Sequence, residues 1–380
     1  MQHLRRGGHA AEALCGSTLD CGRGVELAEW LSARSLRGEV SAAHSLVIDP
    51  RGARSEQPIR YRLSSGGLPV MLIAGASTRY HELDHGESEG FLRAYDEALE
   101  RLDPEVVIGY GGGRLQREVF TRARRQGRIT VFDLHNCRYE ASEPFEHVDA
   151  IRVPSPFAAD HYRMRLGLEC TALPPIVDPG RIRASRSDPR FVTFVNPTIG
   201  KGALVFARLA HELGRRRPDI PFLAVEVCGE ERHLASCGLD LREYGNVFLM
   251  PHTPTPRRIY SVARIMLVPS LVPETFGLVA AEAMANGIPV LASDRGALAD
   301  TVGGAGLIES LPERLTPEAA ILPEPDEIAH WADAIERLWD DHNLYEHFRE
   351  LAIERSRLWH PEAVLPSYER FLDGLTRIIH

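Results

Sequence analysis

The stretch that decides the fold runs from Pro269 to Val290 and reads PSLVPETFGLVAAEAMANGIPV. It places two carboxylates, Glu274 and Glu282, eight residues apart across the start of a helix of small residues. At a rise of about 1.5 Å per residue they would stand roughly 12 Å apart along the axis, with the unpaired N–H groups of the first turn between them. Helix N-termini favour phosphate, and carboxylates accept hydrogen bonds from hydroxyls. The stretch therefore predicts a nucleotide-sugar site.

The alternative is a core helix that happens to carry two glutamates. Ala280, Ala281 and Ala283 make the helix thin enough to bury, and Glu282 stands among them. Glutamate is almost never fully buried unless it is paired. Glu282 therefore favours the site over the plain core helix.

In this stretch the chain resembles the family 4 glycosyltransferases, which are retaining enzymes with the two-domain GT-B fold. The resemblance rests on Glu-x7-Glu preceded by Pro-Ser and followed by Gly-x-Pro-Val, all of which is present. It implies that Glu274 contacts the transferred sugar and that Glu282 holds the ribose. It also implies that the backbone N–H groups of Phe276 and Gly277 bind the diphosphate, with Thr275 beside them in the nucleotide site.

The composition is that of an ordinary globular chain. Its 380 residues, 44% apolar and 26% charged, indicate two domains with a sizeable core. A formal net charge of −9 gives no basic footprint for nucleic acid. The six cysteines are scattered, which favours free thiols in a reducing cytoplasm over a disulfide scaffold or a zinc site. We see no signal peptide and no apolar run long enough to span a membrane, while peripheral membrane contact stays open.

Short apolar strands alternate with amphipathic helices, which predicts an α/β fold with parallel sheets in two series. The first series has strands at Ala11–Cys15, Ser45–Ile48, Pro69–Ile73, Val106–Tyr110, Thr130–Asp133 and Ala150–Val153, with helices around Gly90–Leu102 and Gly113–Gln126. The second series has strands at Phe191–Asn196, Leu223–Cys228, Val247–Met250, Ile265–Pro269 and Pro289–Ala292.

Prolines and a glycine in Leu173–Gly180 indicate a linker between the two series. We therefore expect the GT-B arrangement of two Rossmann-like domains facing across a cleft, with residues 1–175 on the acceptor side and residues 176–360 on the donor side. An amphipathic pattern in residues 361–380 predicts a C-terminal helix, which in the GT-B fold crosses back to the first domain.

A second motif opens the second series, where an apolar strand runs into the loop Asn196–Gly202, NPTIGKG. Lys201 stands near a helix start, where a cation is unfavourable unless an anion is bound. In the resembling family this Lys-Gly neutralises the leaving diphosphate. A plain solvated lysine is the alternative. The family also has an arginine in this loop, and Asn196 stands at its place. One phosphate contact is therefore either lost or supplied from elsewhere, with Arg257 or Arg295 as candidates.

The first series offers one candidate catalytic residue, His135, at the end of an apolar strand. A histidine at the carboxyl end of a strand faces the cleft, titrates near neutrality and can donate to a sugar hydroxyl or a phosphate. Family members commonly place a histidine here, close to the reacting sugar. A structural loop histidine is the alternative. The glycines Gly111–Gly113 match neither a dinucleotide nor a P-loop pattern.

The nucleobase is expected beside Met250 and His252, in a loop where the family uses backbone contacts. No Asp-x-Asp motif lies near the donor site, so no metal is expected. Lys201, helix N–H groups and nearby arginines would balance the phosphate charge.

The segment His81–His85, HELDH, matches the zinc-protease pattern. Gly86 follows it at once and no apolar stripe precedes it, which favours a solvated loop.

The N-terminus departs from the family. The segment Leu4–Ala10 resembles the end of the family's first helix, so the usual first strand and its Gly-Gly loop are expected to be missing. Loss of a central strand would expose ladder groups and apolar surface. Three explanations stay open: translation that begins upstream, a first domain rebuilt in part with the helical-looking Gly24–Ala33, or lost catalysis.

The sequence thus predicts a retaining, metal-independent hexosyltransferase that moves a sugar from a nucleoside-diphosphate donor to an unidentified acceptor in the cytoplasm. Glu274, Lys201 and His135 are the predicted catalytic residues. We expect no cofactor besides the donor substrate, no nucleic-acid partner and no integral membrane segment. Two alternatives remain: a non-catalytic sugar-nucleotide-binding protein, and a GT-B sugar phosphorylase or epimerase.

Overall fold

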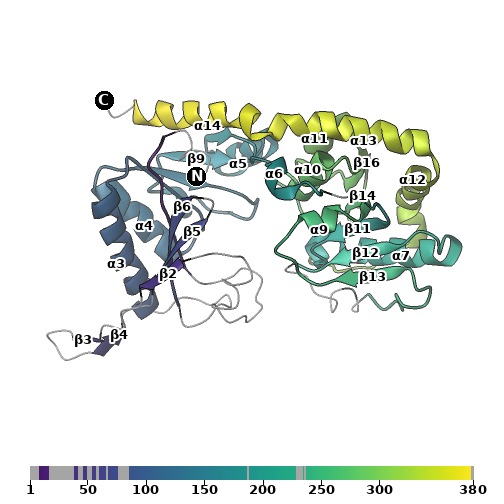
Figure 1. The fold of residues 1–380 in the computed structure, drawn as a ribbon, viewed down its shortest axis with the longest axis horizontal. Coiled ribbons are helices and arrows are strands. Elements are labelled where there is room, and N and C mark those ends of the chain that lie inside the picture. The colour runs from purple at the N-terminus through teal and green to yellow at the C-terminus, as the bar shows by residue number, and fades with distance from the viewer. Residues whose placement is uncertain are drawn as a thin grey trace. The chain divides into compact units, whose positions relative to one another are not determined.

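The computed structural model describes residues 8–16, 38–41, 46–48, 54–56, 60–65, 67–75, 85–185, 188–227, 234 and 237–377. The chain divides into two compact units (Figure 1). Unit 1 comprises Met1–Asp133, Ala141–Ile151 and Glu369–His380, and unit 2 comprises Leu134–Glu140 and Arg152–Tyr368. These units divide the chain at other residues than the predicted domain boundaries, which stay a prediction.

The first sheet of unit 1 mixes parallel and antiparallel strands. Its order is β1-β6-β5-β2, with β1 at Ala13–Gly16, β2 at Gly38–Ser41, β5 at Arg60–Ser65 and β6 at Leu68–Ile73. β1 pairs parallel with β6, whereas β5 is antiparallel to both β6 and β2. The expectation of purely parallel sheets is therefore wrong here. Two residues separate β5 from β6, too few for a parallel crossover, and Gly67 turns with φ at +84°.

A separate antiparallel pair, β3 (Leu46–Ile48) and β4 (Arg54–Glu56), follows β2 in the sequence. Two segments of the sequence analysis fall outside the described residues: the helical-looking Gly24–Ala33 and the part of the His-Glu-x-x-His segment up to Asp84. Only His85 of that segment is described, as the first residue of a helix. The missing first strand stays a prediction.

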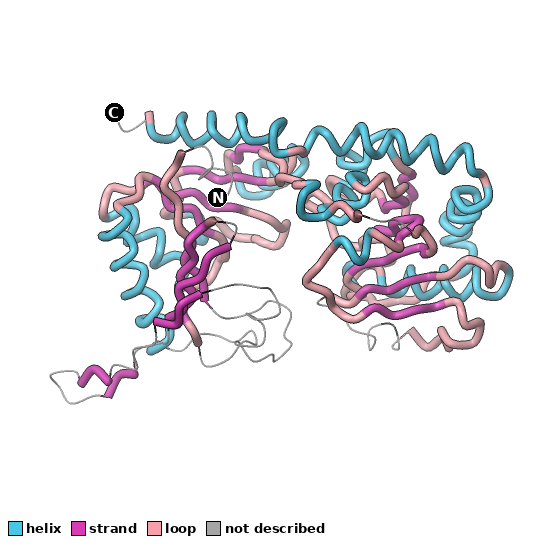
Figure 2. Tube along the Cα trace, viewed as in Figure 1, coloured by secondary structure: helices cyan, strands magenta, loops and turns pink. Residues whose placement is uncertain are grey.

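The second sheet has the order β10-β9-β8-β7. Its strands are β7 (Val106–Gly109), β8 (Ile129–Asp133), β9 (Ala150–Val153) and β10 (Cys170–Ala172), and the neighbouring helices are α3 (His85–Leu102), α4 (Arg114–Arg125), η1 (Glu143–Phe145) and α5 (Pro156–Leu166). In unit 1, α3 and α4 lie side by side (Figures 1 and 2). Leu92 and Leu99 of α3 pack with Val119 of α4, and the hydroxyl of Tyr95 donates to the Val119 carbonyl at 3.1 Å.

Unit 2 is built on a six-stranded sheet of order β13-β12-β11-β14-β15-β16. All of its neighbouring strands pair parallel, as predicted. The strands are β11 (Phe191–Val195), β12 (Phe222–Val225), β13 (Val247–Met250), β14 (Ala263–Val268), β15 (Val290–Ser293) and β16 (Leu307–Glu309). Five of them lie within two or three residues of the predicted bounds. Neither β16 nor β10 was predicted from the sequence.

The helices of unit 2 cover both faces of this sheet (Figure 2). They are α6 (Pro179–Ile182), η2 (Ile199–Lys201), α7 (Ala203–Arg216), α9 (Arg257–Tyr260), α10 (Leu278–Ala285), α11 (Leu298–Val302), η3 (Gly303–Ala305), η4 (Pro325–Ile328), α12 (Ala329–Asp340), α13 (His342–Ser356), η5 (Arg357–Trp359) and α14 (Pro361–Thr376). The residues of α14 from Glu369 onward belong to unit 1.

Alternate residues of β14 serve two cores. Ile265 and Leu267 pack with α7 and α12, while Met266 and Val268 pack with α10 on the other face. In the first core the ring of Phe206 lies 5.1 Å from that of Phe194 and is fully buried. Burial of such a side chain contributes about 1.5–3 kcal/mol. Burial on both faces explains why these strands read as continuous apolar runs.

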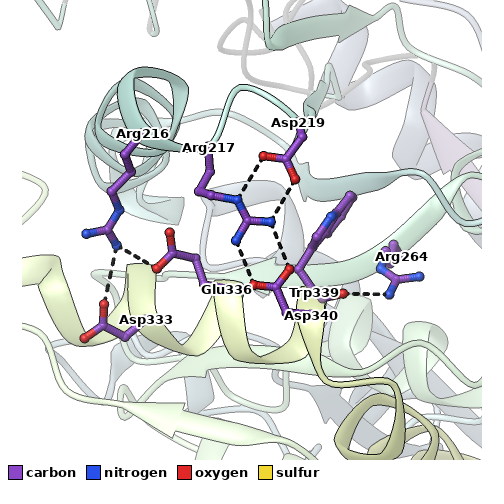
Figure 3. A network of polar contacts seen from close by, with 8 residues as sticks. All are labelled: Arg216, Arg217, Asp219, Arg264, Asp333, Glu336, Trp339 and Asp340. Carbon is purple, nitrogen blue, oxygen red and sulfur yellow. Dashed lines mark hydrogen bonds and ion pairs between the residues drawn. The ribbon is translucent and has the colours of Figure 1, made fainter.

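The end of α7 is held to α12 by charged pairs (Figure 3). The Arg217 guanidinium bonds to Asp219 and to Asp340, and Arg216 pairs with Glu336 at 3.1 Å. Nearby, Arg264 donates to the Trp339 carbonyl at 3.1 Å. The network links α12 to the end of α7, and none of its residues is a predicted site residue. Among the described residues, no helix is long and apolar enough to cross a membrane.

Candidate functional site

The predicted donor-site loops meet where β11, β14 and β15 end, the edge at which open α/β sheets bind ligands. The loop after β11 docks on the loop after β14: the Leu271 N–H donates to the Gly200 carbonyl at 2.9 Å. Gly202 has φ +92°, and a Cβ there would lie 2.0 Å from the Pro269 carbonyl oxygen. Only glycine allows this approach, which sets Lys201 beside the β14 loop.

Lys201 and Glu274 are brought together. The Lys201 ammonium lies 2.5 Å from Oε1 of Glu274, and the hydroxyl of fully buried Ser270 donates to the same oxygen at 2.7 Å. The side chain of Glu274 is 14% exposed and that of Lys201 37%. The ammonium has three N–H donors. It can therefore keep this pair and still face an anion from solvent.

The backbone of Glu274 is fixed from β15. Glu274 forms an isolated parallel bridge with Gly296, and the Ala297 N–H donates to the Glu274 carbonyl at 2.8 Å. Gly296 has φ +69°, and a Cβ there would lie 2.4 Å from the Glu274 carbonyl oxygen. The carboxylate thus stands on a rigid support.

Helix α10 begins later than the sequence indicates. It starts at Leu278 with Gly277 as N-cap, at φ +87°. Glu274 therefore lies outside the helix, and the estimate of roughly 12 Å along a helix axis does not apply. Within the described part of the chain, the N–H groups of Phe276 and Gly277 have no hydrogen-bond acceptor. Together with the first turn of α10 they form a row of open donors next to Glu274.

Glu282 is paired with Tyr260, whose hydroxyl donates to its Oε2. Burial raises the pKa of Glu282, and the hydrogen bond from Tyr260 opposes that shift. Burial, and then the charge of Glu282, raise the pKa of Tyr260 well above its ordinary value, so the phenol stays protonated as the donor. No hydrogen bond to the other carboxylate oxygen is found among the described residues.

His135 reaches this region through its main chain. It lies in the segment Leu134–Glu140 of unit 2, and its carbonyl accepts a hydrogen bond from Oγ1 of Thr275 at 2.7 Å. Its side chain is exposed. Burial, and then the charge of Glu274, raise the pKa of the Cys137 thiol to about 11. The predicted catalytic histidine therefore lies in a loop next to the Glu274 segment.

The other predicted nucleotide residues lie further along the same sheet edge. Asn196 follows β11 with φ +67°, and its N–H donates to the Val225 carbonyl at 2.8 Å. The Met250 carbonyl, at the end of β13, accepts from the Glu226 N–H at 2.9 Å. His252 lies exposed two residues later.

The two arginines considered as substitutes for the missing arginine are engaged elsewhere. Arg257 donates to the carbonyls of Gly180 and Arg181. Arg295 donates to the Leu311 carbonyl at 3.0 Å and to the Pro312 carbonyl at 3.2 Å. Neither guanidinium adds a cation to the Lys201 loop in this structure.

Sequence reasoning missed Ser270 and Tyr260 as partners of the two glutamates, because nothing in a single hydroxyl residue signals which carboxylate it faces. It also missed a signal in the amino-acid composition. Lys201 is the one lysine in the whole sequence, and the other 43 basic residues are arginines. Among the residues that the structure describes, no three His, Cys, Asp or Glu side chains gather as metal ligands.

Comparison with known proteins finds glycosyltransferases. Residues 181–355 match the family model described as glycosyl transferases group 1. The chain is 30% identical over 186 residues to a D-inositol 3-phosphate glycosyltransferase of Paenarthrobacter aurescens (strain TC1), covering 46% of this chain and 42% of that protein. It is 28% identical over 260 residues to a 2-deoxystreptamine glucosyltransferase of Streptomyces kanamyceticus, covering 58% and 63%. The chain thus spans about two fifths to three fifths of the length of these relatives.

Among solved structures, sucrose-phosphate synthase from Thermosynechococcus elongatus superimposes with a TM-score of 0.65 at 18% identity, over 97% of this chain and 100% of that one. Identity this low speaks for the fold alone. The predicted resemblance is confirmed: the chain has the GT-B fold, and its residues 181–355 match the group 1 glycosyl transferases.

Proposed function

We propose that the protein is a glycosyltransferase that moves a sugar from a nucleoside-diphosphate donor to an acceptor. One observation carries the proposal: the sole lysine, the Glu274 carboxylate and the open N–H groups of Phe276 and Gly277 lie together at the carboxyl ends of parallel strands. A cation and a row of N–H donors suit a diphosphate, and the adjacent carboxylate suits a sugar hydroxyl.

The hydrogen bonds within the site support an assignment of each side chain to one part of the donor. Oε1 of Glu274 is already shared by Lys201 and Ser270, so Oε2 would accept from a hydroxyl of the donor sugar. Lys201 would turn its remaining N–H groups to the diphosphate. Glu282, held by Tyr260 on one oxygen, would accept from the ribose with the other. The base would lie beside Met250 and His252.

For the chemical step we propose transfer with retention. The bond between the anomeric carbon and the diphosphate oxygen breaks while the acceptor oxygen bonds to the same face of that carbon, and the acceptor proton passes to the departing diphosphate. Lys201 and the N–H groups would stabilise the negative charge that develops on the diphosphate, without a metal. His135 would donate to a sugar hydroxyl or a phosphate. No carboxylate nucleophile is assigned.

The relatives suggest where to search for the acceptor. One is named for D-inositol 3-phosphate and another for 2-deoxystreptamine. Both are six-membered carbocycles with several hydroxyls. We propose a hexose donor and a polyhydroxylated acceptor of this class.

The test is incubation of the full chain with UDP-, GDP- and ADP-hexoses, with and without these acceptors, in the presence of a chelator. Release of nucleoside diphosphate that rises with one acceptor, and a product with the donor's anomeric configuration by NMR, would support the proposal. Tight binding of a nucleotide sugar without release under any condition would favour the non-catalytic binding protein instead. Loss of activity in the chelator, restored by a divalent cation, would refute metal independence.

A further inference from the structure

Thr275 joins the predicted donor site to the loop of the predicted catalytic histidine. Its hydroxyl donates to the main-chain carbonyl of His135 at 2.7 Å, and the residue is 8% exposed. In the sequence it stands between Glu274 and the open N–H groups of Phe276 and Gly277. One side chain thus ties the backbone of the donor site to the backbone of His135.

Residues 134–140 form no helix or strand, so side-chain contacts help to hold this loop in place. The fully buried Tyr162 donates to the Asn136 carbonyl at 2.7 Å and accepts from the Tyr139 N–H at 3.4 Å. The His135–Asn136 segment therefore receives hydrogen bonds from two buried hydroxyls, those of Thr275 and Tyr162, while the imidazole itself lies exposed.

We infer that Thr275 is a positioning residue that sets the imidazole of His135 relative to the donor sugar, and that its hydroxyl is not a nucleotide ligand. The inference rests on the proposed function. A threonine hydroxyl has one proton, and here that proton goes to the His135 carbonyl. Without this bond the loop keeps one hydroxyl anchor of two. A misplacement of about 1 Å can cost roughly 10²-fold in rate, so a smaller shift of the ring already carries a measurable loss.

Two substitutions separate the hydroxyl from the volume of the side chain. Thr275→Val keeps the shape and removes the donor, whereas Thr275→Ser keeps the donor. We expect the valine variant to lower kcat for transfer by about tenfold or more, with the Kd of the nucleoside diphosphate within about twofold of the wild type. The serine variant should transfer at close to the wild-type rate. Equal melting temperatures would show that the fold is kept in both.

A double-variant cycle gives the decisive readout, because a structural role and a positioning role differ there. In a His135→Ala background, Thr275→Val should cost no further rate. A further loss as large as in the wild type would overturn the inference, and so would a valine variant with full rate or with weakened nucleoside diphosphate binding. A wild type that binds the donor but transfers no sugar would overturn the proposed function and the inference with it.

Discussion

At the residue scale, the central feature is Lys201, the one lysine of a sequence that otherwise uses arginine. An arginine would present a planar fork, while the ammonium of Lys201 is a compact point charge with donors to spare. It contacts an oxygen of the mostly buried Glu274 carboxylate, to which Ser270 also donates. The pair places a cation beside a hydrogen-bond acceptor. The cation suits the diphosphate of a nucleotide sugar, and the acceptor suits a hydroxyl of its sugar.

Lys201→Ala should lower turnover by about 10²–10³-fold, because it removes a charge-assisted contact to the developing diphosphate charge. Lys201→Arg should restore only part of this loss, since a guanidinium does not reproduce the position of the ammonium. Steady-state kinetics of the three proteins check the order. Unchanged turnover in the alanine variant would show that another group holds the anion.

The single lysine also makes the contact directly visible. Amine-selective acetylation followed by peptide mass spectrometry can modify one side chain only, at Lys201, besides the amino terminus. A bound nucleoside diphosphate should slow modification of Lys201 and leave the amino terminus unaffected. Equal rates with and without nucleotide would contradict the assignment.

We predict that the ionised Glu282 side chain lowers the stability of the folded protein although it contributes to nucleotide binding. Its pKa is raised in the folded state, so the group favours folding most below the ordinary carboxyl value of 4.5, and that contribution is lost as the pH rises through the folded pKa. Glu282→Gln should therefore raise the melting temperature at about pH 7 and leave it unchanged near pH 4, while weakening nucleotide binding. The exposed Glu354→Gln serves as the matched control and should change neither. A glutamine variant less stable at neutral pH would disprove the account.

At the element scale, the site is made by loops that glycines allow to touch. Gly202 lets the β11 loop meet Pro269, and Gly296 lets the β15 loop bridge Glu274. These contacts place side chains from separate strands within hydrogen-bond distance. Gly277 turns the chain with φ at +87° just before α10, whose first turn has unpaired N–H groups.

Gly296→Ala should disturb both stability and the site. The added Cβ meets backbone atoms of Glu274 at 2.4 and 2.5 Å, and the positive φ strains any side chain there. We expect the free energy of unfolding to fall by about 1–3 kcal/mol and the affinity for the nucleotide sugar to weaken. Gly304→Ala is the control, because its Cβ would meet no atom within 4 Å. Chemical denaturation of both variants checks the difference, and equal midpoints would argue against the bridge.

Whether the sequence predicts a strand depends on how much of that strand is buried. Strands buried on both faces, such as β14 and β15, read as apolar runs and were predicted within two residues. β5 alternates arginine and serine with Tyr61 and Leu63 and was missed, as was the half-buried three-residue β16. The motif residues were predictable because their types are specific. Their partners, Ser270 and Tyr260, depend on tertiary contacts that no local pattern encodes.

At the scale of the whole molecule, all predicted site residues, His135 included, fall in unit 2. Nucleotide binding should therefore stabilise that unit in particular, by mass action on the folded state. Two compact units also mean that unfolding of the chain need not be a single two-state transition.

The central claim is that Glu274 and Glu282 hold opposite ends of one nucleotide sugar, and calorimetric titration of both alanine variants tests it most directly. Each variant and the wild type are titrated with the nucleoside diphosphate and with the matching nucleotide sugar. We predict that Glu282→Ala weakens both ligands alike, whereas Glu274→Ala spares the nucleoside diphosphate and removes the extra affinity that the sugar provides. Equal losses of nucleoside diphosphate affinity in both variants would contradict the proposed orientation.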